Sequence, residues 1–122
     1  MLHLRINFIQ HLAQREKVVN MIANNEIPYD LTLSHSVAVP TQYADVSVGS
    51  SPKIVVENID GKQCILFYTF LGLTDNSAGF VYVPDETILE KTKIGQSNAS
   101  TIFYNPIQTK KIKDHWYFIS NT

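Results

Sequence analysis

The N-terminal stretch of the sequence has apolar positions that recur with the period of an α-helix. They are separated by three, four or seven residues, which places them on one face of a helix. Asn24 and Asn25, followed closely by Pro28, end the pattern, because the residue before a proline is held extended. The sequence therefore predicts a long amphipathic helix from Leu2 to Asn25. Its predicted apolar face holds Leu4, Phe8, Leu12, Val19 and Ile22, widened by Ile9 and Met21, and its predicted polar side holds Gln14, Arg15, Lys17 and Asn20.

From Tyr29 onward the apolar positions follow the two-residue period of β-strands. In the stretch from Tyr29 to Val39, every second residue is apolar except His35, and the stretch ends at Pro40. A histidine at such a position is either a core residue with satisfied ring nitrogens or a general base at the mouth of a cavity. Both interpretations of His35 stay open.

Asp60 and Gly61 predict a tight β-hairpin between two apolar runs. This dipeptide readily supplies the positive φ angles of a primed turn. A turn at this point sets Ile54 opposite Phe67. The second run, Cys64 to Leu71, is apolar on both faces, which is typical of a central strand that is covered on both sides.

The rest of the chain predicts further short elements. Residues 43–48 are expected to form a short extended piece that runs into a loop at residues 49–52. Residues 85–95 are expected to form a short helix capped by Asp85, and residues 100–105 and 115–120 to form the last two strands. One helix followed by five to seven strands predicts an α+β fold over residues 1–122, taken as a single domain. In it a curved, mostly antiparallel sheet packs against the helix. We expect a partner chain or sheet curvature to cover the second face of the sheet.

Composition and charge narrow the classes of partner. Charged residues make up 17% of the 122 residues, below the roughly one quarter of an average globular domain. Either the surface is rich in uncharged polar side chains, or part of it is buried in an oligomer; we expect a homodimer formed through the sheet. The net charge of −1 provides no field that would attract nucleic acid or a membrane surface.

Targeting and membrane signals are also missing from the sequence. The N-terminal residues lack the continuous apolar region of a secretory signal, and no later segment is long enough to span a bilayer. We therefore expect a cytoplasmic protein with no membrane partner.

The sequence carries no motif for a cofactor, a metal or a nucleophile. Its single cysteine, Cys64, excludes an internal disulfide and a CxxC pair. His3 and His11 are eight residues apart, about 80° around a helix, which does not suit a zinc site. The adjacent carboxylates Asp85 and Glu86 fit helix capping better than acid–base chemistry. We therefore expect no cofactor and no metal, and we assign no catalytic residue.

The last predicted strand holds the main candidate for a binding surface. Alternation puts His115 and Tyr117 on one face of this strand, and Trp116 and Phe118 on the other. If the second pair enters the core, three tyrosines of other strands are expected to share the face of His115: Tyr68, Tyr82 and Tyr104. Such a face suits a small aromatic or polar ligand, or alternatively a dimer interface. The candidate ligand-binding residues are His35, His115, Tyr117, Tyr104 and Tyr82.

A lysine cluster precedes the same strand, in what the sequence predicts to be a turn. Lys110, Lys111 and Lys113 lie close to aromatic residues, an arrangement that holds single-stranded nucleic acid in other proteins. Three lysines are few, however, and lysine at a sheet edge also protects against aggregation. The sequence therefore argues against a nucleic-acid partner.

These patterns favour a small soluble interaction or ligand-binding domain without catalytic activity. It would act as a homodimer and engage a protein partner or a small ligand. The alternative is a small enzyme or ligand-binding protein with a cone-shaped cavity between the sheet and the helix. In that alternative, His35 or His115 is the polar group of the cavity.

Overall fold

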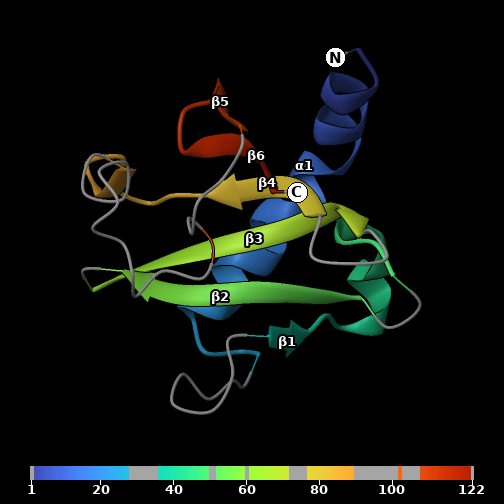
Figure 1. Ribbon diagram of the computed structural model, residues 1–122. Coiled ribbons are helices and arrows are strands. Elements are labelled where there is room, and N and C mark those ends of the chain that lie inside the picture. The colour runs from blue at the N-terminus through green and yellow to red at the C-terminus, as the bar shows by residue number, and fades with distance from the viewer. Residues whose placement is uncertain are drawn as a thin grey trace.

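The computed structural model describes residues 2–27, 36–49, 52–59, 61–71, 77–89, 102 and 108–121 (Figure 1). Within these residues an N-terminal helix packs against a six-stranded antiparallel sheet that does not close into a barrel. The predicted α+β class is thereby confirmed. In chain order the elements are α1 (Leu2–Ala23), β1 (Ser36–Ala38), the 3₁₀-helix η1 (Thr41–Val46), β2 (Lys53–Ile59), β3 (Lys62–Leu71), β4 (Ser77–Tyr82), β5 (Gln108–Lys113) and β6 (Trp116–Asn121).

The strands lie in the order β1-β2-β3-β4-β6-β5, and every neighbouring pair is antiparallel. The predicted hairpin joins β2 to β3: Gly61 has a φ of 81°, and Ile54 lies opposite Phe67. β3 therefore lies inside the sheet, as its two apolar faces predict. Of the predicted strand from Tyr29 to Val39, the described part is β1 and Val39, so His35 lies outside the described residues.

α1 buries one face, although two residues do not lie where the sequence predicts. Phe8, Val19 and Ile22 are buried as predicted. Ile9 is 73% exposed, so the prediction that it widens the apolar face is wrong. The prediction that Arg15 lies on the polar side is also wrong, because its side chain is 1% exposed. Arg15 follows Phe8 by seven residues, which is about two turns, and so faces the same way.

Arg15 connects α1 to η1 and to the sheet. Its Nε donates a hydrogen bond to the Val46 carbonyl (3.0 Å), and its Nη2 donates one to Asn7 Oδ1 (2.9 Å). The guanidinium lies over the Phe80 ring, with 4.9 Å from Cζ to the ring centroid, so that a cation–π contact offsets part of the cost of burial. Burial lowers the pKa of the guanidinium to about 10, which leaves it charged at neutral pH.

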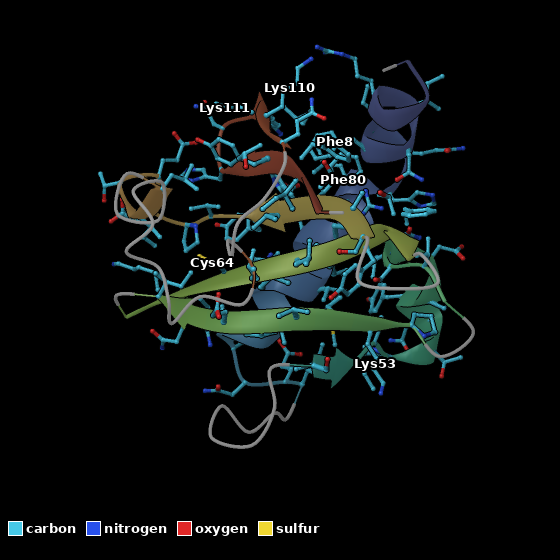
Figure 2. The ribbon with its side chains drawn as sticks, viewed as in Figure 1. Phe8, Lys53, Cys64, Phe80, Lys110 and Lys111 are labelled. Carbon is cyan, nitrogen blue, oxygen red and sulfur yellow. The ribbon has the colours of Figure 1, made fainter. Side chains whose placement is uncertain are left out.

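The face of the sheet toward α1 is filled by large side chains. Phe8 packs edge-on against Phe80 and Trp116, with ring centroids 5.1 and 5.6 Å away (Figure 2). Phe67 and Trp116 lie 5.8 Å apart, centroid to centroid. This layer is the core on which the helix rests.

The outer face of the sheet is covered by the chain itself. Ile88, Leu89 and Ile102, from the segment between β4 and β5, are buried against it. The sheet residues beneath them are Val55, Cys64, Leu66, Val81, Tyr117 and Ile119. The covering layer is thus intramolecular, which differs from the expectation of a partner chain or of sheet curvature.

Two further segments differ from their sequence predictions. Residues Thr41–Val46 form η1 rather than an extended piece, because Pro40 begins a tight turn in which its carbonyl accepts the Tyr43 N–H (2.9 Å). Lys110, Lys111 and Lys113 lie within the edge strand β5 and not in a turn (Figure 2). The turn begins after them, at Asp114.

Gly79 marks the closest backbone approach between β3 and β4. A Cβ atom at this position would lie 2.3 Å from the Phe67 carbonyl oxygen. We expect Gly79→Ala to lower the free energy of unfolding by about 1–3 kcal/mol, because the strands must separate to accept the methyl group. Urea denaturation measures this loss, with Gly61→Asn as the control, since Asn tolerates a positive φ and nothing lies within 4 Å of that site. Equal stability of Gly79→Ala and wild type would contradict the described pairing.

Candidate functional site

The turn between β5 and β6 contains a histidine in a conformation that L residues rarely adopt. His115 has a φ of 73°, in the left-handed region, which costs a non-glycine residue about 1–2 kcal/mol. The sequence predicts a strand that already includes His115, but β6 begins at Trp116. The prediction was wrong here because the two-residue turn Asp114-His115 needs this left-handed residue to close the hairpin.

Two hydrogen bonds hold His115 in place. Its backbone N–H donates to Glu86 Oε1 (2.8 Å), and its ring Nδ1 lies 2.9 Å from the Val83 carbonyl oxygen. Because a carbonyl only accepts, Nδ1 carries the proton. In the neutral ring, Nε2 is then the nitrogen with a free lone pair.

Glu86 is the centre of this contact network. Besides the His115 N–H, its carboxylate accepts a hydrogen bond from Lys111 Nζ (3.0 Å), and the Tyr117 hydroxyl lies near it. These bonds, the His115 N–H first, lower the pKa of Glu86. Burial, together with the neighbouring Glu86 carboxylate, raises the pKa of Tyr117. Lys111 also lies 3.2 Å from Asp114 Oδ1, so one ammonium is shared between the carboxylates of Glu86 and Asp114.

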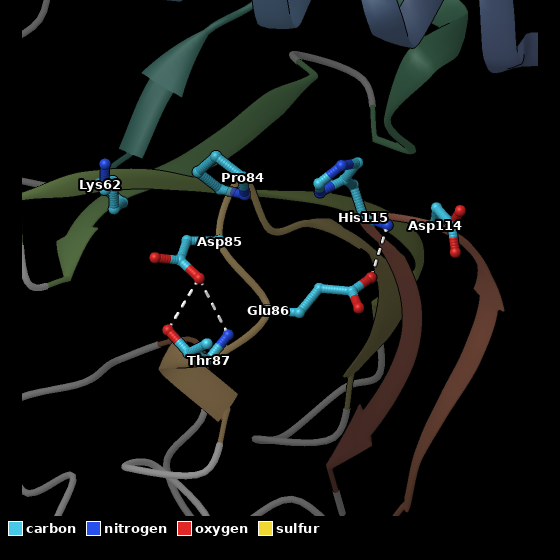
Figure 3. Close-up of a pocket in the computed structure, with 7 residues that line it drawn as sticks. All are labelled: Lys62, Pro84, Asp85, Glu86, Thr87, Asp114 and His115. Atoms are coloured by element: carbon cyan, nitrogen blue, oxygen red, sulfur yellow. Dashed lines mark hydrogen bonds between the residues drawn. The ribbon is translucent and has the colours of Figure 1, made fainter.

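An open depression of about 580 Å³ lies beside this network. It is formed by the start of β3, the segment after β4 and the β5–β6 turn. Figure 3 shows Lys62 and His115 on either side of Pro84. The lining residues are Lys62, Pro84, Asp85, Glu86, Thr87, Asp114 and His115.

Some polar groups of this depression are hydrogen-bonded within the chain, and others have no partner among the described residues. Asp85 Oδ1 accepts hydrogen bonds from the Thr87 N–H (3.0 Å) and hydroxyl (2.7 Å), which is the predicted capping role. Glu86 is hydrogen-bonded as described above. Lys62, in contrast, is exposed and has no ion pair or hydrogen bond from its side chain within the described ranges. The free groups are therefore the Lys62 ammonium and the His115 Nε2.

A second depression, of about 370 Å³, adjoins the first and shares Lys62 and Pro84 with it. It lies where the C-terminal turns of α1 meet the β2–β3 hairpin. Its walls combine apolar side chains with amides that can donate and accept hydrogen bonds. The remaining lining residues are Val19, Asn20, Ala23, Asn58, Gly61, Gln63, Ile65 and Tyr82.

The candidate residues predicted from the sequence are partly brought together. The rings of Tyr82 and His115 lie 6.0 Å apart, centroid to centroid, while Tyr117 reaches the same region through Glu86. The prediction that Tyr82 and Tyr117 share a face of the sheet is wrong. Tyr82 lies opposite Trp116 in the β4–β6 pairing and points toward α1 with it. His35 and Tyr104 lie outside the described residues.

Sequence reasoning missed Lys62 and assigned Glu86 only to capping. Glu86 lies 29 residues before His115 and 25 before Lys111, so no local pattern reveals their contact. Lys62 directly follows Gly61 in the predicted hairpin turn. This position identifies the end of the sheet at which Lys62 lies, but not the residues that face Lys62.

Metal, membrane and comparative observations complete the description of the site. Among the described residues, no group of three His, Cys, Asp or Glu side chains is placed to hold a metal ion. No helix in the described ranges is long and apolar enough to cross a membrane. Comparison of the chain with protein-family models, with curated proteins and with solved structures finds no match.

The Glu86 network predicts a pH-dependent contribution to stability. The folded-state pKa of Glu86 is lowered, so its contribution is present above the unfolded-state pKa and is lost as pH falls through the folded-state value. We expect Glu86→Gln to be less stable than wild type at neutral pH, and the difference to shrink in acid. Urea denaturation across this range measures it, with the exposed Glu26→Gln as the matched control. A difference that stays constant with pH would contradict the ion pairing described here.

Proposed function

We propose that this protein binds a small organic anion without transforming it, at the end of the sheet where Lys62 and His115 face one depression. The observation that supports the proposal is the difference between the polar groups of the depression that are hydrogen-bonded within the chain and those that are not, among the described residues. Asp85 and Glu86 make hydrogen bonds within the chain, whereas among the described residues the Lys62 ammonium and the His115 Nε2 make none. An exposed ammonium with no carboxylate partner among the described residues favours an anionic ligand, such as a carboxylate, over a cation at that position.

The adjoining depression indicates the rest of the ligand. Ala23, Tyr82 and Pro84 provide apolar walls, and Asn20 and Asn58 provide amides at the margin. A carboxylate near Lys62 would leave an attached ring or aliphatic group over Pro84 and Tyr82. We therefore propose an aromatic or aliphatic carboxylate as the ligand class, in agreement with the small aromatic or polar ligand expected from the sequence.

The absence of an assigned nucleophile supports binding rather than catalysis. Cys64 is fully buried, and burial, with the Glu57 carboxylate nearby, raises the pKa of its thiol to about 12. A thiol in this state does not form the nucleophilic thiolate at neutral pH. Glu57 itself accepts the Ile102 N–H (3.2 Å) and holds the covering segment on the sheet.

The alternative proposal is a small enzyme or ligand-binding protein with a cavity between sheet and helix. Phe8, Phe80 and Trp116 pack edge to face in that space. This packing favours the margin of the sheet over its interior as the binding position. In this alternative His35 or His115 is the polar group of the cavity.

Chemical-shift perturbation by NMR tests the proposed ligand site. We expect benzoate to shift the backbone signals of Lys62, of His115 and of the residues on either side of Pro84. Neutral benzamide should shift these signals much less. Lys62→Gln should weaken benzoate binding by about tenfold, which corresponds to the loss of one charge-assisted hydrogen bond. Lys53→Gln is the matched control, because Lys53 lies at the far end of β2 (Figure 2).

Two outcomes would contradict the proposed ligand site. One is a spectrum that benzoate leaves unchanged at every concentration tested. The other is equal binding by wild type and Lys62→Gln, since the proposal assigns the anionic group to that ammonium.

We also propose that the protein is a homodimer and that the compartment is the cytoplasm. The low charged fraction, 17%, supports a surface that is buried between copies. The intramolecular cover of Ile88, Leu89 and Ile102 makes the outer sheet face a poor choice for that surface. The two exposed isoleucines of α1, Ile6 and Ile9, indicate a different surface for the contact between copies.

A further inference from the structure

α1 carries a second apolar stripe on a side away from its buried face. Ile6, Ile9 and Ala13 are separated by three and four residues, the spacing of the contact positions in a coiled coil. Ile6 is 50% exposed and Ile9 is 73% exposed. At about 100° per residue this stripe is centred roughly 150° from the stripe of Phe8, Arg15 and Ile22.

The position of this stripe leaves it accessible. Figure 1 shows the N-terminal turns of α1 standing clear of the strands. The contacts of α1 with η1 and β3 come from its other face, through residues such as Phe8 and Arg15. An apolar stripe with coiled-coil spacing that no described residue covers is suited to pack against another helix.

We propose that this stripe is the homodimer interface, in which the α1 helices of two copies pack antiparallel across a two-fold axis. The inference rests on the dimer named under the proposed function and specifies its surface. A second copy is chosen as the occupant because the charges beside the stripe complement themselves. A two-fold interface requires that property, since the same patch lies on both sides.

The complementary charges are Arg5 and Glu16. Both are exposed, and they flank the same side of the stripe, about 20° apart around the helix. Residues 1–15 contain no acidic side chain. A parallel two-fold pair would place the two Arg5 side chains on opposite sides of the interface and far from Glu16, whereas an antiparallel pair sets Arg5 of each copy against Glu16 of the other.

In the same antiparallel register the apolar stripes of the two copies overlap at Ile9 and Ala13. With Arg5 level with the partner's Glu16, Ile9 lies level with position 12 of the other helix. It therefore falls between the partner's Ile9 and the partner's Ala13. The small Ala13 side chain lets the two helices approach closely around Ile9, as knobs-into-holes packing requires.

Sedimentation equilibrium of the full chain tests the interface. We expect a wild-type mass of about twice 13.8 kDa and a monomer for Ile9→Glu, with the circular dichroism spectrum unchanged because Ile9 is exposed. Arg5→Glu and Glu16→Arg should each weaken the dimer by about tenfold, since each turns two attractive pairs into repulsive ones. The double variant should restore it, and Lys53→Glu is the control.

The outcomes separate the surface from the dimer itself. A wild-type monomer at all concentrations would overturn both the dimer and this interface. A dimer that Ile9→Glu and both charge reversals leave intact would keep the dimer and overturn the interface. Single reversals that weaken the dimer without rescue in the double variant would overturn the antiparallel pairing.

Discussion

The hydrogen bond from the His115 backbone to Glu86 is the constraint on which the candidate site depends. It holds a non-glycine residue in the left-handed region and ties the β5–β6 turn to the segment that follows β4. Once His115 is fixed, its Nδ1 meets the Val83 carbonyl and the Val83 N–H meets the His115 carbonyl (2.7 Å). The imidazole is oriented as a result, and Nε2 remains as the group available to a ligand.

A second buried contact, that of Arg15, positions the helix. Its guanidinium joins α1 to η1 through the Val46 carbonyl and rests on the Phe80 ring. Its Nη1 is buried without a hydrogen-bond partner among the described residues, so this anchor carries a desolvation cost. The anchor leaves the second apolar stripe, with Ile6 and Ile9, facing away from the sheet. One helix thereby serves both the core and the proposed contact between copies.

The sequence predicts the parts of the fold that local chemistry determines. Asp60-Gly61 and the runs beside it predict the β2–β3 hairpin with its register, and the recurrence of apolar positions predicts α1. The two errors in α1 arose because residues were assigned to a face of the helix by their polarity and not by their angular position. Arg15 looks polar but shares the angular position of Phe8, and Ile9 looks apolar but faces outward. The site was harder to predict, because Glu86 and His115 meet only through the pairing of three strands, β4, β6 and β5. His35 and Tyr104 fall outside the described residues.

The most direct test of the account is the tautomer of the neutral His115 ring, read from a long-range nitrogen–proton NMR correlation spectrum. The account predicts a proton on Nδ1, where it donates to the Val83 carbonyl, and an unprotonated Nε2 that can accept a hydrogen bond. A neutral ring protonated on Nε2 would contradict the claim that Glu86 and Val83 fix the orientation of this histidine.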